Sequence, residues 1–176
     1  MIFTETPLSG AFIVDLEYRN DKRGFFARTW CKEEFALHHL DTSLIQCNIS
    51  FNRLQGTLRG LHYQSFPYQE IKLVRCTMGA IYDVIVDLRV ESATYKNWFG
   101  TELSASNRRS LYVPAGFAHG FLTLVNETEV FYQMSEFHHP EFSRGVRWND
   151  PNIAICWPEY PSVISDIDQQ YPDLGI

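Results

Sequence analysis

The sequence has no excess of positive charge, no long apolar run and no paired cysteines, and each absence removes a class of function. Its 15 lysine and arginine residues are outnumbered by 21 aspartate and glutamate residues, and the formal net charge is -6 at pH 7. Nucleic acids and anionic membranes bind extended basic surfaces, so we expect neither as a partner. Any anion that this protein binds should be small.

Membrane, export and disulfide signals are also missing. No apolar run approaches the roughly 18 residues of a membrane-spanning helix, and the opening MIFTETPLSG lacks the basic-then-apolar order of a secretory signal. We therefore expect a cytoplasmic protein. The cysteines are widely separated and form no CxxC pair, which predicts reduced thiols rather than a zinc site or disulfides; they are Cys31, Cys47, Cys76 and Cys156.

Short β-strand patterns dominate the chain. Runs of β-branched and aromatic residues end repeatedly in turn residues, as in GAFIVDLEY and KLVRCTMGAIYDVIVDLRV, which predicts antiparallel sheets. With 45% hydrophobic residues, residues 1–176 suffice for one domain with one core. A short helix is expected within residues 31–40, with its apolar positions Phe35, Leu37 and Leu40 facing inward, and a further helical turn is expected in the C-terminal tail.

Two strand patterns predict which side chains share a face. In residues 81–88 the even positions are apolar and predict a core face, while the odd positions place Asp83 and Asp87 on the other face. The stretch VNETEV reads as a hairpin connection between a strand bearing His119 and a strand bearing Tyr132. The two side chains should therefore lie on neighbouring strands.

The stretch RGLHYQSFPYQEIKLV concentrates Arg59, His62 and Lys72, with Glu70 as its only acid. Clustered cations repel one another unless an anion joins them, and arginine binds phosphate through two parallel hydrogen bonds. Cations beside an imidazole also favour its neutral form, which suits a general base. Taken singly, the histidine is more simply explained as a structural residue, and each cation as part of a solvated surface. Their combination indicates a site for a phosphorylated metabolite.

A second motif, YVPAGFAHGF, has the P-x-G-x-x-H spacing of the second cupin motif. A metal-binding cupin also needs an H-x-H pair on the partner motif, and here that segment reads His62-Tyr63-Gln64. We therefore predict no metal. His119 is either a structural histidine with its hydrogen bonds satisfied or a ligand contact, and the sequence leaves both readings open.

Taken together, several stretches resemble the dTDP-4-dehydrorhamnose 3,5-epimerase family from about residue 2 to the end of the chain. The resemblance implies a cupin-type jelly roll, all-β with a few short helices, and a homodimer that shares its N-terminal strands. It also implies that no metal or organic cofactor takes part. The matching stretches are DKRGFFARTW, QCNISFNRLQGTLRGLHYQ, KLVRCTMGAIYDVIVDLR, LYVPAGFAHGF, EVFYQMSEF and RGVRWNDPNIAICWP.

The resemblance also implies roles for individual residues. His62 takes the place of the general base and Asp168 pairs with it, Tyr132 is the opposing acid, and Lys72 lies near the substrate ketone. Substrate contacts carry over to Arg23, Phe26, Gln46, Asn48, Arg59 and His119, and His138 stands where an aromatic residue often stacks on the nucleotide base. Because Arg23 and Arg59 each precede a glycine, we expect both to grip the diphosphate, Arg23 from the neighbouring subunit.

The implied activity is epimerisation of a nucleotide-linked 4-keto-6-deoxy hexose at C3, C5 or both, by proton abstraction and reprotonation. The chain departs from the usual family pattern among the substrate contacts; the departures are Arg28, His138, Ser143 and Ile167. Alternatives are therefore an epimerase that acts on a CDP- or GDP-linked sugar at one centre only, or a non-enzymatic or metal-dependent cupin that binds a sugar or small acid. The pairing of Lys72 and Tyr132 with His62 favours the enzyme.

Overall fold

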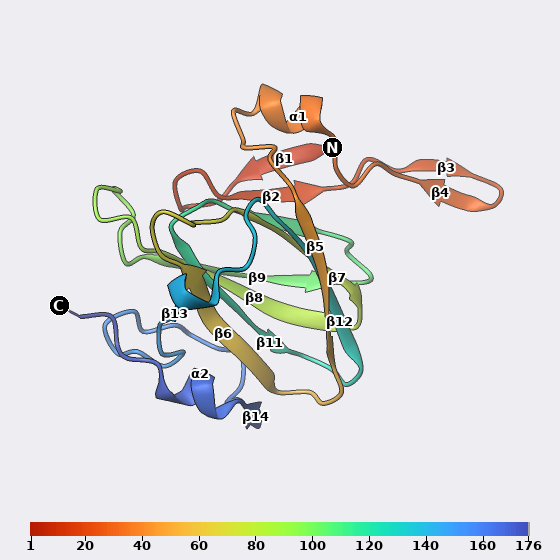
Figure 1. Ribbon diagram of the computed structural model, residues 1–176. Helices are drawn as coiled ribbons and strands as arrows, with labels where there is room; N and C mark the ends of the chain where they lie inside the picture. Colours follow the sequence, from red (N-terminus) through yellow and green to blue (C-terminus); the bar gives the residue numbers. More distant parts are fainter. Residues whose placement is uncertain (176) are drawn as a thin grey trace.

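The computed structural model describes residues 1–175 as two antiparallel sheets that face each other (Figure 1). The first sheet has the order β1 (Ile2–Glu5), β2 (Phe12–Asp15), β10 (Ser110–Val113), β7 (Lys72–Met78), β12 (Thr128–Met134) and β5 (Gln46–Asn52). The second has the order β13 (Ser143–Gly145), β6 (Thr57–Gln64), β11 (Phe117–Thr123), β8 (Ala80–Asp87) and β9 (Trp98–Ser104), and the short strand β14 (Val163–Ile164) pairs with β6 in parallel. The predicted cupin-type jelly roll is confirmed.

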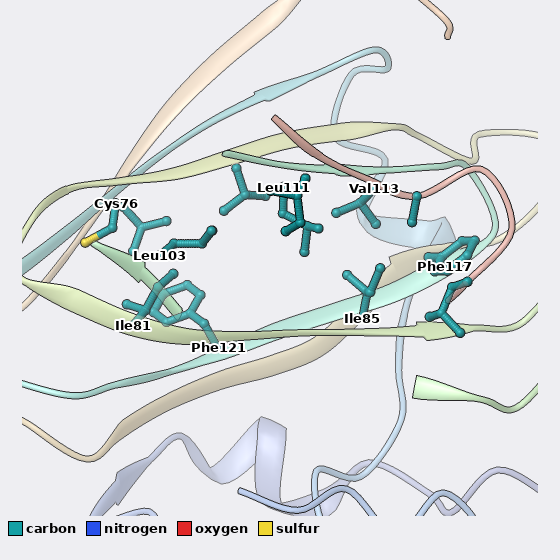
Figure 2. Packing of buried hydrophobic residues seen from close by; sticks show 13 residues of the cluster. Cys76, Ile81, Ile85, Leu103, Leu111, Val113, Phe117 and Phe121 are labelled. Carbon is teal, nitrogen blue, oxygen red and sulfur yellow. The ribbon is translucent and has the colours of Figure 1, made fainter. Parts of the chain in front are cut away.

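The main hydrophobic core fills the space between the two sheets (Figure 2). Ile85 of β8 and Phe121 of β11 meet Leu111 of β10 and Val113 across this space. Alternation along each strand sends every second side chain into the core. Packing of this interior layer sets the separation of the sheets, and therefore the width of any cavity between them.

Smaller elements cover the outer faces. The helix α1 (Lys32–Leu37) packs Phe35 against the outside of the first sheet, and the C-terminal segment with α2 (Asp166–Gln170) lies along the second. The two-stranded hairpin of β3 (Arg19–Asp21) and β4 (Gly24–Phe26) extends away from both sheets (Figure 1). A one-turn 3-10 helix, Pro140–Phe142, precedes β13. No helix in residues 1–175 is long and apolar enough to cross a membrane.

One prediction about burial was incomplete, and another was wrong. Both faces of β8 are buried: Val84 packs beneath the C-terminal segment, whereas Asp83 and Asp87 are fully buried on the face toward the other sheet. The C-terminal segment covers what would otherwise be a solvated face, so alternation between apolar and acidic residues does not mark exposure here. In α1, Phe35 is buried as expected, but Leu37 is 79% exposed, because a residue two positions further along a helix lies on nearly the opposite side.

The expected pairing of the strands that carry His119 and Tyr132 was also wrong. β11 lies between β6 and β8 in the second sheet, and β12 lies between β7 and β5 in the first. The connection between β11 and β12 therefore crosses from one sheet to the other. His119 and Tyr132 approach the interior from opposite sheets rather than from neighbouring strands.

Candidate active site

A cavity of about 590 Å³ opens between the two sheets. Its wall contains most of the residues that the sequence nominates, and they come from both sheets. From the first sheet come Gln46, Asn48, Lys72 and Tyr132, from the second come Arg59, His62 and His119, and His138 lies after β12. On β5 the inward positions are polar, which turns this edge strand into a hydrogen-bonding wall.

An irregularity in the β6–β11 pairing shapes the floor of the site. His119 pairs with His62 and Phe121 with Arg59, so β6 carries one extra residue between these two pairs. Bulges of this kind redirect side chains beside active sites. Gly60 has φ +122, and a Cβ there would lie 2.6 Å from the Gly120 Cα, so only glycine fits. The Gly60 amide donates to Asp168 Oδ2 at 3.1 Å.

His62 and Asp168 form a hydrogen-bonded pair. The distance from His62 Nε2 to Asp168 Oδ1 is 2.7 Å, and the His62 side chain is 42% exposed while that of Asp168 is 7% exposed. Burial raises the pKa of Asp168, but the hydrogen bond and charge of His62 and the Gly60 amide outweigh it, so this pKa lies below its ordinary value. Because the Asp168 carboxylate accepts a hydrogen bond from Nε2–H of His62, the other ring nitrogen, Nδ1, is the one that is free to take a proton.

Lys72 bridges the two sheets next to His62. Its Nζ lies 2.8 Å from Glu70 Oε1 and 3.4 Å from the His62 carbonyl oxygen. The Lys72 side chain is 10% exposed and that of Glu70 is 4% exposed. Glu70 therefore neutralises Lys72, and it is Asp168, distant in sequence, that holds the imidazole.

Tyr132 and Arg59 occupy the remaining wall. Burial raises the pKa of the Tyr132 phenol, against a smaller lowering effect of the Arg59 charge, so the phenol keeps its proton at neutral pH. No residue in 1–175 hydrogen-bonds its hydroxyl. Arg59 Nε donates to Asn52 Oδ1 at 2.7 Å, which orients the guanidinium and leaves its terminal amino groups for an anion.

His119 is part of a second histidine–carboxylate pair. Its Nε2 lies 2.7 Å from Oδ1 of Asp83, and the two side chains are 11% and 0% exposed. The residue is thus hydrogen-bonded and nearly buried, yet it lines the cavity. The hydrogen bond to Asp83 shows that one ring nitrogen of His119 has a structural partner. Contact with a ligand stays a prediction, and the position of His119 in the cavity wall is consistent with it.

Two nominated contacts lie outside the cavity of their own chain. Phe26 is 67% exposed on the β3–β4 hairpin, and Arg23, at the turn of that hairpin, has an 89% exposed side chain that pairs with Asp21. Of the four departures from the family pattern, His138 and Ser143 line the cavity. Arg28 pairs with Glu34 at 2.8 Å, and Ile167 is 67% exposed.

Tyr171 is a wall residue that the sequence analysis missed. It lines the cavity, and its ring makes an edge contact with the His62 ring at a centroid distance of 5.8 Å. Its ring lies against Gly145, where a Cβ would come within 2.3 Å of it. Burial, and then the Asp168 charge, raise the pKa of its phenol. The sequence did contain one indication of this position. Tyr171 follows Asp168 by three residues, and side chains with this spacing lie next to each other when the segment is helical.

The side chains around this cavity do not converge as metal ligands do. Within residues 1–175, no group of three or more histidine, cysteine, aspartate or glutamate side chains is arranged to hold a metal ion. His62 and His119 each direct one nitrogen to a carboxylate of its own rather than toward a common point. The prediction that no metal takes part stays a prediction, and it is consistent with this arrangement.

Comparison with known proteins agrees with this geometry. The family model described as dTDP-4-dehydrorhamnose 3,5-epimerase matches residues 5–175. An enzyme of that name from Sinorhizobium fredii is 44% identical over 99% of this chain and 90% of its own length. The crystal structure of one from Bacillus anthracis, with TDP and PPi bound, has a TM-score of 0.94 at 43% identity and covers 98% of this chain and 99% of that one. The crystal structure of a Legionella pneumophila dTDP-6-deoxy-D-glucose-3,5-epimerase in complex with dTDP-4-keto-L-rhamnose has a TM-score of 0.91 at 33% identity. It covers 98% of this chain and 92% of that one. The chain belongs to the dTDP-4-dehydrorhamnose 3,5-epimerase family.

Proposed function

We propose that this protein is an isomerase that epimerises a nucleotide-linked 4-keto-6-deoxy hexose and forms dTDP-4-dehydrorhamnose. The observation that carries the proposal is the arrangement across one cavity: the His62–Asp168 pair belongs to one side, Tyr132 stands on the opposite sheet, and Lys72 reaches between them. A base, an acid and an electrophile around one space are what inversion next to a ketone requires.

In this proposal His62 removes the proton. The hydrogens on C3 and C5 are weakly acidic because loss of either gives an enolate on the C4 carbonyl. His62 Nδ1 takes the proton, Asp168 stabilises the resulting imidazolium, and Lys72 donates a hydrogen bond to the developing enolate oxygen. The geometry that supports this is the 2.7 Å bond from His62 Nε2 to Asp168 and the low exposure of Lys72, since electrostatic stabilisation is stronger away from water.

Tyr132 then returns a proton from the opposite face of the ring. Its raised pKa keeps the phenol protonated, and its hydroxyl has no hydrogen bond to residues 1–175, so it is free to donate. The phenolate that forms lies near the Arg59 charge, which is the one that lowers this pKa. One proton leaves to His62 and one arrives from Tyr132, so the reaction is balanced without an organic cofactor or metal, and bulk solvent resets both groups.

We further propose that the enzyme is a homodimer with shared sites. Arg23 and Phe26, on the β3–β4 hairpin, are exposed and do not line the cavity of their own chain, which a partner's cavity would explain. The outward face of β5 supports the same conclusion, because Ile49 is 62% exposed and Phe51 is 45% exposed on neighbouring outward positions. A second copy of the chain would cover this apolar strand.

Subunit mixing tests the shared site. Arg23→Ala should raise KM and His62→Ala should abolish turnover, so each homodimer is impaired at substrate concentrations near the wild-type KM. Random re-pairing makes half the dimers mixed, each with one intact site, and should restore about a quarter of wild-type activity. If verified subunit exchange restores nothing, Arg23 acts within its own chain and the shared site is wrong.

The activity itself is tested by exchange in D2O. Wild-type protein should place deuterium at C3, C5 or both in a dTDP-linked 4-keto-6-deoxyglucose, and NMR assigns the positions directly. The CDP- and GDP-linked sugars, tested in parallel, decide whether His138 changes the nucleotide. Absence of exchange with all three sugars, from protein confirmed to be folded, would leave the binding-only cupin as the better reading.

A further inference from the structure

Glu70 is a buried carboxylate in the cavity wall with one unused oxygen. Its Oε1 contacts Lys72 at 2.8 Å, and the side chain is 4% exposed. Its Oε2 is buried and has no hydrogen-bond partner within residues 1–175. A buried acceptor without a donor carries the full cost of desolvation, and the cost is larger for a charged group. Because Glu70 lines the same cavity as His62, a molecule that enters this cavity can supply the donor.

We propose that Glu70 Oε2 accepts a hydrogen bond from the C3 hydroxyl of the sugar and makes the enzyme selective for that hydroxyl. This inference rests on the proposed function, which directs Lys72 Nζ to the C4 carbonyl oxygen. The two oxygens of Glu70 share one carbon, so a group bound to Oε2 lies beside the carbonyl that Lys72 engages. Of the two carbons next to C4, C3 bears a hydroxyl and C5 bears a methyl group, and only the hydroxyl is a donor.

The arrangement also suits the intermediate formed at C3. Loss of the C3 proton gives an enediolate, in which the C4 oxygen is negative and the C3 oxygen keeps its proton. Lys72 and Glu70 meet these opposite requirements, one as donor and the other as acceptor. The Lys72 charge offsets the carboxylate, so Glu70 does not oppose the negative charge that develops on the C4 oxygen.

Calorimetric titration of wild-type protein provides the first test, with three unreactive ligands that carry a hydroxyl at C4. These are dTDP-6-deoxyglucose, its 3-deoxy analogue and its 2-deoxy analogue. A hydrogen bond to a charged group predicts that the 3-deoxy analogue binds about 10- to 100-fold more weakly than the parent. The 2-deoxy analogue should bind within about threefold of it. Equal affinity for the 3-deoxy analogue and the parent would overturn the proposal.

Variants then assign the preference to Glu70. Glu70→Met has no acceptor at a similar volume and should bind the parent and the 3-deoxy analogue equally, within about threefold. Glu102→Gln, at an exposed carboxylate on β9, is the control and should keep the wild-type ratio. If unpaired Lys72 prevents Glu70→Met from folding, Glu70→Gln has a single acceptor oxygen and should lower the preference at least about fivefold.

A full preference retained in the Glu70 variant would assign the hydroxyl contact to another residue and overturn the proposal. Failure of wild-type protein to bind dTDP-6-deoxyglucose at all would instead contradict the proposed function, and the inference would fall with it. The parent ligand therefore separates the two failures, because only the second abolishes its binding.

Discussion

Replacing Asp168 with asparagine should inactivate His62 while leaving the fold intact. Asp168 accepts from two donors, His62 Nε2 at 2.7 Å and the Gly60 amide at 3.1 Å. An asparagine has one acceptor oxygen and one NH2 group, so it cannot accept from both. If its oxygen keeps the Gly60 bond, its NH2 faces Nε2, and the imidazole must carry its proton on Nδ1. Nδ1 is then unable to act as the base.

The expected size of this effect comes from what general-base catalysis contributes in comparable sites. General-base catalysis contributes roughly 10²- to 10⁴-fold, and the wrong tautomer in a comparable histidine–aspartate pair costs about 10⁴-fold in kcat. We expect Asp168→Asn to lower kcat by about 10³-fold, between these limits, with KM within a fewfold of wild type because the carboxylate does not line the cavity. The Asp168 pKa lies below its ordinary value, so wild-type protein keeps the carboxylate charged throughout the neutral range.

Steady-state kinetics and C3/C5 deuterium exchange measure the loss directly. Asp166→Asn is the matched control, because Asp166 lies on the same α2 helix but is exposed, and it should retain full activity. A thermal melt must show that Asp168→Asn is folded. A folded Asp168→Asn protein with kcat within fivefold of wild type, roughly 1 kcal/mol in barrier height, would refute the role of Asp168.

Three further predictions address the wall, the fold and the cofactor. Tyr171→Ala should lower kcat about tenfold with little change in KM, because the His62 ring loses its edge contact; Tyr171→Phe keeps that contact and should restore the rate. Asp87 is buried, but hydrogen bonds from Arg89, Ser92 and Thr94 lower its pKa to about 2. Its contribution of about 2–3 kcal/mol is therefore present above the unfolded pKa and lost as pH falls toward 2, so the stability difference between wild type and Asp87→Asn should shrink between pH 5 and 2 in urea unfolding. A strong chelator should change neither turnover nor melting temperature, and stoichiometric bound metal together with chelator inactivation would contradict this.

The parts of the fold that could be predicted from sequence are those with local patterns. Strand alternation and turn residues identify the β-strands, and the short stretch from Arg59 to Lys72, which spans two consecutive strands, contains several of the cavity's charged residues. These features depend on neighbours in sequence, so one chain is enough to find them. Gln46 and Asn48, on the inward face of β5, were nominated through the family resemblance.

Features that depend on distant contacts could not be read in this way. Sheet membership separated His119 from Tyr132, because a connection that looks like a hairpin can cross between sheets. The acids of β8 became buried because the C-terminal segment covers the opposite face and the other sheet covers theirs. Asp168 was found as the partner of His62 only through the family resemblance, since 106 residues separate them.

Some predictions go beyond what the fold of one chain decides. The homodimer, the location in the cytoplasm and the absence of a nucleic-acid or membrane partner stay predictions, and so does the single domain over residues 1–176. The exposed hairpin with Arg23 shows why the first of these matters: if the dimer does not form, this predicted phosphate contact has no place in the site.

The central claim is that His62 and Tyr132 act on opposite faces of the same sugar, and Tyr132→Phe in D2O tests it most directly. The variant keeps the ring but lacks the proton to be delivered. NMR should show deuterium entering the substrate through His62 at a rate within about tenfold of wild type, while inverted product falls by about 10²-fold or more. Exchange and inversion that decline together would contradict the claim, because Tyr132 would then support the enolate or the bound pose instead of donating the second proton.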